Sequence, residues 1–89
     1  MRLLTLIVGA IPEKFDLLPD LAARVAELAQ GRPVSLAPVT AYQPGRDRGF
    51  AAVKCEAEDD WFATAAGPGV TLVALQGALA AAGAARRAA

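Results

Sequence analysis

Four carboxylates within five positions form the densest group of chemically active side chains in this sequence: Glu56, Glu58, Asp59 and Asp60. Paired carboxylates can hold a divalent cation or act as general acid and base. Their spacing is not that of a calcium-binding loop, and the chain contains no His that could complete a metal or catalytic set. We therefore predict solvated charges that discourage association between sheet edges, with no metal site.

Cys55 is the only thiol in the chain. It alternates with Val53 and Ala57, which places it on the apolar side of a strand, and its basic neighbour Lys54 falls on the opposite side. Without His, neither a Cys–His nor a Ser–His pair can form within one chain. The sequence therefore predicts a buried, inert cysteine, no catalytic residue and no cofactor. A single Cys also excludes an internal disulfide and fits a reducing compartment, so we expect a cytoplasmic protein.

The stretch Gly67–Gly69, followed by Thr71, has features of a phosphate-binding helix start. Backbone N–H groups at such a start attract anions, so Gly67, Gly69 and Thr71 are candidates for a weak anion site. However, Leu72 stands where a dinucleotide-binding motif needs its third glycine, and no Lys follows, as a P-loop would require. We predict instead a connection from a strand into the last helix, with Thr71 as its cap.

Aromatic and basic side chains near two predicted turns are candidates for contact with a partner. Arg46 and Arg48 lie in the turn segment 44–49, where they could contact phosphate or an acidic protein, although a solvated turn has the same composition. Trp61 follows the acidic segment, where a Trp either fills the core or anchors an interface. The interface candidates are Trp61, Tyr42, Arg46 and Arg48.

These side chains must be positioned by strands and by two helices. The segment 1–11 is apolar on both alternating faces, which is typical of a strand inside a sheet. A helix is predicted from an N-cap at Asp16 to a stop at Gly31, with Asp20 and Arg24 at the spacing of an ion pair. Its apolar stripe consists of Leu18, Leu21, Val25 and Leu28.

The second half of the chain reads as strands followed by a helix. Pro38 interrupts the segment 33–43, which favours an edge strand or a bulge. The segment 50–58 alternates as a half-solvated strand of an antiparallel hairpin does, and 61–65 fits a short further strand. The last helix follows Thr71 with an apolar stripe of Leu72, Leu75 and Leu79.

The predicted order is β-α-β-β-(β)-α in a single domain spanning residues 1–89. This order predicts an α+β two-layer sandwich, ferredoxin-like or related, with two helices on one face of an antiparallel sheet. The usual last strand of a ferredoxin-like fold has no room after Leu79. Either the segment 61–65 takes its place, or another chain completes the sheet.

Charge and hydropathy limit the class of partner. Nine basic and nine acidic residues give no net charge, which argues against nonspecific nucleic-acid binding without excluding a local basic patch. The uncharged window 62–85 is long enough to span a bilayer, but Pro68, Gln76 and several glycines interrupt it, so we predict no membrane span. The abundance of Ala and Arg is compatible with a bacterial or phage gene of high GC content.

The sequence predicts a small soluble interaction module that self-associates through sheet edges or helix faces, because its core is alanine-rich and no catalytic set is present. Two alternatives stay open. One is a nucleic-acid-associated regulator that uses Arg46, Arg48, Arg86 and Arg87. The other is a small-ligand or enzyme domain with a cleft between helices and sheet.

Overall fold

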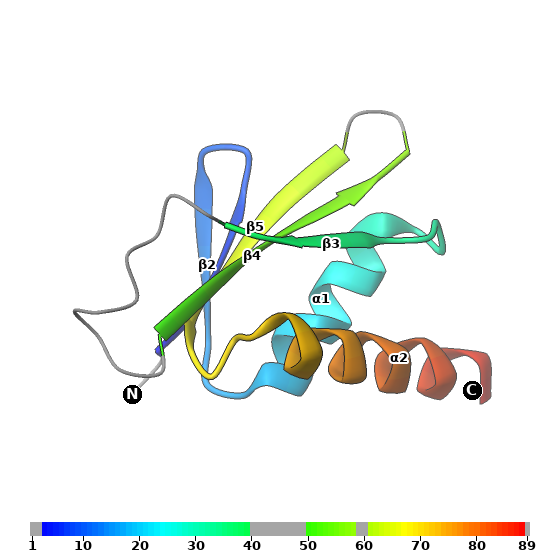
Figure 1. Cartoon of the computed structure of the whole chain (residues 1–89). Helices are drawn as coiled ribbons and strands as arrows, with labels where there is room; N and C mark the ends of the chain where they lie inside the picture. Colours follow the sequence, from blue (N-terminus) through cyan, green and yellow to red (C-terminus); the bar gives the residue numbers. More distant parts are fainter. Residues whose placement is uncertain (1–2, 40–49, 59–60, 89) are drawn as a thin grey trace.

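The chain folds into one antiparallel sheet with two helices against one of its faces. The computed structural model describes residues 3–39, 50–58 and 61–88, without the side chains of Phe50 and of residues 84–88. The strands lie in the order β2-β1-β5-β4-β3, and the helices form the second layer (Figure 1). The predicted two-layer α+β sandwich is confirmed. The elements are β1 (Leu4–Val8), β2 (Ile11–Phe15), α1 (Leu18–Ala29), β3 (Ser35–Pro38), β4 (Phe50–Ala57), β5 (Trp61–Pro68) and α2 (Leu72–Ala88).

The N-terminal segment forms a hairpin, whereas the prediction of a single strand over residues 1–11 is wrong. Gly9 lies in the turn with a φ of 63°, a conformation that glycine adopts without steric cost. β2 then pairs antiparallel with β1 along its whole length. The pattern did not predict β2 because its sequence contains Pro12 and two charges, a composition that suits only an edge strand.

β5 is the central strand of the sheet, between β1 and β4. The further strand predicted over 61–65 is confirmed and extends to Pro68. β5 fills the position beside β1 within the same chain, so no other chain is needed to complete the sheet. The resulting order ββαβββα differs from the βαββαβ order of a ferredoxin-like fold.

β3 is an edge strand, as Pro38 predicts. The Val39 N–H donates to the Ala52 carbonyl at 3.0 Å. Because alternate residues of a strand point to the same side, the backbone groups of Leu36 and Pro38 point to the free edge. Pro38 offers no N–H there, so this edge is a poor template for an additional strand.

α1 buries its predicted apolar stripe, but its start and its ion pairs differ from the prediction. The N-cap residue is Leu17, which is extended and makes no side-chain capping bond, so the assignment of Asp16 is wrong. Arg24 pairs with Glu13 at 2.9 Å and with Glu27 at 2.6 Å rather than with Asp20. Its hydrogen bond to Glu13 raises the pKa of Arg24. Arg24 therefore connects α1 to the edge strand β2.

Buried apolar side chains of both helices and of β1, β4 and β5 fill the space between the layers, and Phe15 of β2 and Leu36 of β3 pack against them. Cys55 is fully buried among them, as predicted. Neither α1 nor α2, over its described residues, is long and apolar enough to cross a bilayer. The largest fully buried side chains are Leu6, Leu21, Leu75, Val25, Val53 and Val70.

Candidate functional site

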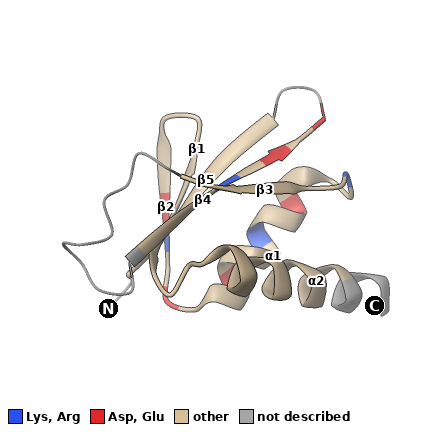
Figure 2. Ribbon diagram, viewed as in Figure 1, with Lys and Arg blue, Asp and Glu red and all other residues tan. Residues whose placement is uncertain are grey.

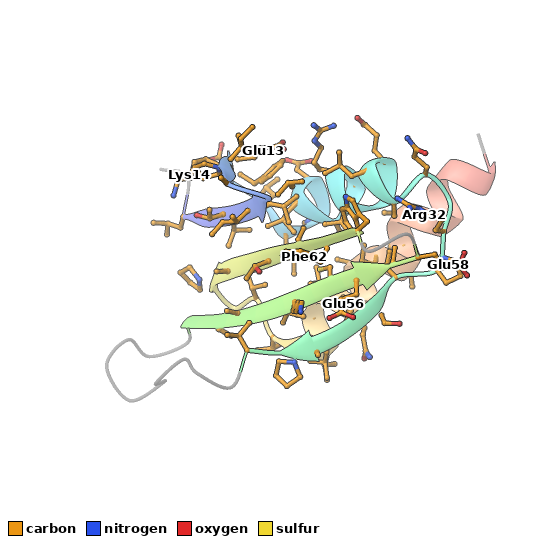
Figure 3. The ribbon with its side chains drawn as sticks, turned by 90° about the horizontal axis from the view of Figure 1, so that it is seen from above. Glu13, Lys14, Arg32, Glu56, Glu58 and Phe62 are labelled. Atoms are coloured by element: carbon orange, nitrogen blue, oxygen red, sulfur yellow. The ribbon has the colours of Figure 1, made fainter. Side chains whose placement is uncertain are left out.

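The candidate site is the side of the sheet turned away from the helices, which we call the open face. Residues opposite each other in an antiparallel pair share a face, so the strand pairings define which side chains it carries. Figure 3 looks onto this face, and no described element lies over it. Among the described side chains, the open face carries Leu3, Thr5, Ile7, Pro12, Lys14, Ser35, Ala37, Ala52, Lys54, Glu56, Phe62, Thr64, Ala66 and Pro68.

Large apolar side chains are exposed on the open face. Leu3 is 54% exposed, Ile7 39% and Phe62 51%. Both alternating rows of side chains in and next to β1 contain large apolar residues, which is typical of a strand covered on both faces. The helices, however, cover only the side that carries Leu4 and Leu6. The second apolar row of the strand therefore faces solvent in a single chain.

The three described charges of the open face all have partners. Lys14 Nζ donates to Thr5 Oγ1 at 2.8 Å. Lys54 Nζ lies 3.0 Å from Glu56 Oε1 and 5.2 Å from the centroid of the Phe62 ring. Because each cation is already paired, covering this surface removes less solvation than covering isolated charges would.

An open hollow of about 310 Å³ lies at the end of the face where β4 finishes and β5 begins. Trp61 lines it and is half-buried, and it also packs against the core. Core packing of Trp61 is thus shown, while a role in an interface stays a prediction. The other residues that line the hollow are Lys54, Glu56, Ala57 and Phe62.

The remaining interface candidates, Tyr42, Arg46 and Arg48, lie outside the described residues. Among the described side chains, four are basic and six are acidic, and the two signs are interspersed along the ribbon (Figure 2). No basic patch appears in this part of the chain. Nothing in the described surface favours a phosphate backbone as the partner.

The prediction that Glu56 guards a sheet edge is wrong. β4 lies inside the sheet, between β5 and β3, and Glu56 pairs with Lys54 on the open face. Glu58 lies just after the strand, and Asp59 and Asp60 are outside the described residues. Over the described ranges, no three His, Cys, Asp or Glu side chains gather in a way that could hold a metal ion.

The glycines of the stretch Gly67–Gly69 have packing and turn roles. Gly67 is buried with a φ of 147°, and a Cβ there would lie 2.9 Å from the Leu3 carbonyl oxygen, so β1 can approach only a glycine. Gly69 turns the chain with a φ of 76°. The Thr71 hydroxyl accepts the Ala74 N–H at 3.2 Å, which confirms the predicted cap. An anion site at these residues stays a prediction.

Burial decides the chemistry of Cys55. With no exposed surface, the thiol loses the solvation that its charged form needs, which raises its pKa to about 11. A reactive cysteine needs a depressed pKa and access to solvent. Cys55 therefore acts as a small apolar residue of the core.

Arg32 was not singled out by the sequence, although it joins two distant elements. Its guanidinium donates to the Ala29 carbonyl at 2.7 Å at the end of α1 and to the Glu58 carbonyl at 2.7 Å after β4. The signal available in the sequence was a basic residue just after a helix, where carbonyls lack partners. Its reach to Glu58 could not be read from spacing.

A second hollow, of about 600 Å³, lies between the end of α1 and α2. Arg32 lines it, and the guanidinium of Arg32 donates to the carbonyls of Ala29 and Glu58. No protein-family model, curated protein or solved structure matches the chain. The function is therefore inferred from the geometry of the described residues.

Proposed function

We propose that this protein is a small, non-catalytic interaction module whose copies associate through the open face of the sheet. One observation carries the proposal: helices cover one face of the sheet, and the other exposes Leu3, Ile7 and Phe62. Paired sheets that pack face to face bury such apolar rows. Each Å² of apolar surface removed from water contributes about 25 cal/mol.

The size of the open face supports association of moderate strength. Five strands spaced by about 4.8 Å, with about 3.3 Å per residue along each, offer roughly 500 Å² on each copy. Full coverage of two copies would bury roughly 1,000 Å², which is the lower limit for a specific interface. We therefore expect a concentration-dependent dimer rather than an obligate one.

The sheet edges support association less well than the open face does. Pro38 removes a donor from the free edge of β3, and β2 carries Pro12 and Lys14. Proline and lysine are typical of edges that are protected against pairing. Among the described residues of α2, Val73 is the one large apolar side chain that is exposed, and a single such side chain does not form an apolar patch.

Two matched substitutions test the proposal. Phe62→Asp places a charge on the open face, whereas Val73→Asp places one on α2, where the wild-type side chain is 77% exposed. Light scattering coupled to size-exclusion chromatography, from micromolar to millimolar protein, should show wild type and Val73→Asp passing from monomer to dimer. Phe62→Asp should stay monomeric, because a buried carboxylate would lose its solvation.

Circular dichroism of both variants controls for folding, which neither change should alter because both side chains are exposed. A wild type that stays monomeric at millimolar concentration would contradict self-association. Equal masses for Phe62→Asp and Val73→Asp would show that association does not use the open face.

A further inference from the structure

We propose that the second copy covers the open face in one orientation, with a twofold axis running along β5. In this dimer β5 faces β5, and β1 of each copy faces β4 of the other. The inference rests on the proposed function and adds the partner and its orientation. It follows from sheet order, strand register, charge and the shape of the face.

Sheet order determines which strand lies on the axis. β5 is central, with β1 and β2 on one side and β4 and β3 on the other. A twofold interface brings the same patch of both copies together. An axis along the central strand exchanges the two sides, so all five strands overlap. This full overlap is needed because the open face only just reaches the area of a specific interface.

Strand register determines the contacts on either side of the axis. Thr64 pairs with Ile7 of β1 and with Lys54 of β4, so these three residues form one row across the sheet. The axis places Ile7 of each copy opposite Lys54 of the other, twice in the dimer. The apolar stem of Lys54 then covers Ile7. Phe62 of one copy meets Phe62 of the other on the axis, where aromatic pairs contribute to binding.

The shape of the face is self-complementary in this orientation. Glu56 and Ala57 pair with Phe62 and Trp61, so the hollow of about 310 Å³ lies two to three residues beyond the Thr64 row. At the same level on the other side of β5, β1 has ended and the exposed turn at Gly9 begins. The axis exchanges these two places. The turn of each copy therefore enters the hollow of the other.

Charge disfavours the other twofold orientation, in which the axis crosses the strands and β4 faces β4. With that axis at the Thr64 row, Lys54 would lie opposite Lys54 of the second copy. Like charges placed opposite each other in an interface repel and disfavour binding. With β5 on the axis, Glu56 instead lies opposite the Gly9 turn at the rim. Its pair with Lys54, at 3.0 Å, is retained there.

Charge substitutions at Ile7 test the orientation directly. Ile7→Glu would lie opposite Lys54 of the second copy, whereas Ile7→Lys would repel it. We expect sedimentation equilibrium to show dimerisation of Ile7→Lys weaker than that of Ile7→Glu by roughly tenfold or more. The exchange variant Ile7→Lys/Lys54→Ile restores an apolar side chain opposite each lysine. Its dimer should return towards the wild-type dissociation constant.

The outcomes separate this inference from the proposed function. If Ile7→Glu and Ile7→Lys weaken the dimer equally, or if the exchange variant does not recover, the orientation is overturned. The open face remains the interface in that case, provided that Phe62→Asp is monomeric and Val73→Asp is not. If wild type never dimerises, both the orientation and self-association are overturned. Circular dichroism of each variant confirms that the subunit is folded.

Discussion

Cys55 shows how the alternation of a strand controls the chemistry of a single side chain. Val53, Cys55 and Ala57 share the face of β4 that packs against the helices, and burial raises the pKa of the Cys55 thiol from 9.0 to about 11. The thiol therefore stays protonated and shielded near neutral pH. This property could be predicted from the sequence because it depends only on the period of one strand.

The raised pKa of Cys55 predicts a loss of stability at alkaline pH. The unfolded chain releases the thiol proton near its ordinary pKa of 9.0, whereas the folded chain holds it until about 11. The stabilising contribution is therefore complete below pH 9 and lost as the pH rises through about 11. Urea denaturation should show the free energy of unfolding of wild type approaching that of Cys55→Ala over this range. A constant difference between them would contradict the shift.

The interaction of Lys54 with Phe62 and Glu56 could be predicted only in part. Alternation places Lys54 and Glu56 on one face of β4, away from Cys55. The place of Phe62 beside them depends on the register between β4 and β5, which follows from a turn that composition does not specify. The sequence therefore directed attention to Trp61 and to the arginines of the segment 44–49 rather than to Phe62.

At the scale of elements, Arg32 joins the end of α1 to the end of β4. Arg32 donates one hydrogen bond to the carbonyl of Ala29, three positions before it, and another to the carbonyl of Glu58, 26 positions after it. The Ala29 carbonyl also accepts the Arg32 backbone N–H at 3.0 Å, so the guanidinium adds a second donor there. The planar guanidinium can reach both because its donors form a fixed fork.

Removal of this link should destabilise the fold measurably. We expect Arg32→Ala to lower the free energy of unfolding by about 1–3 kcal/mol, as loss of charged hydrogen bonds does. Arg32→Lys should recover little, since an ammonium cannot reproduce the fork. Arg24→Ala is the control: its ion pairs are partly exposed, so we expect a smaller loss of the free energy of unfolding in urea denaturation than for Arg32→Ala. Equal losses for Arg32→Ala and Arg24→Ala would contradict this account.

The spacing of apolar residues predicted the helices and strands that bury one regular face. It failed for strands whose place in the sheet depends on pairing with distant segments. Both helices, β4 and the edge position of β3 follow from the spacing of apolar residues and from Pro38. β2 was not predicted because an edge strand with Pro12 has little apolar pattern of its own. The central place of β5 depends on contacts between distant segments, which a local pattern does not contain.

At the scale of the whole molecule, the helices leave one face of the sheet uncovered. β1 and β5 carry Ile7 and Phe62 to that face, while β2 and β3 form edges that resist further strands. A domain of this length has a small core, for which association is a common additional source of stability. In the proposed dimer, the helix layer covers one face of β1 and the sheet of the second copy covers the other, which accounts for apolar side chains on both faces of this strand.

The most direct test of the central claim is an isotope-filtered NOE experiment on an equal mixture of labelled and unlabelled protein at millimolar concentration. It reports only contacts between different copies. If the open face binds a second copy, contacts between chains should appear at the Phe62 ring and between the Ile7 methyls and the Lys54 side chain. Contacts between chains only at Val73 of α2, or none at all, would contradict the claim.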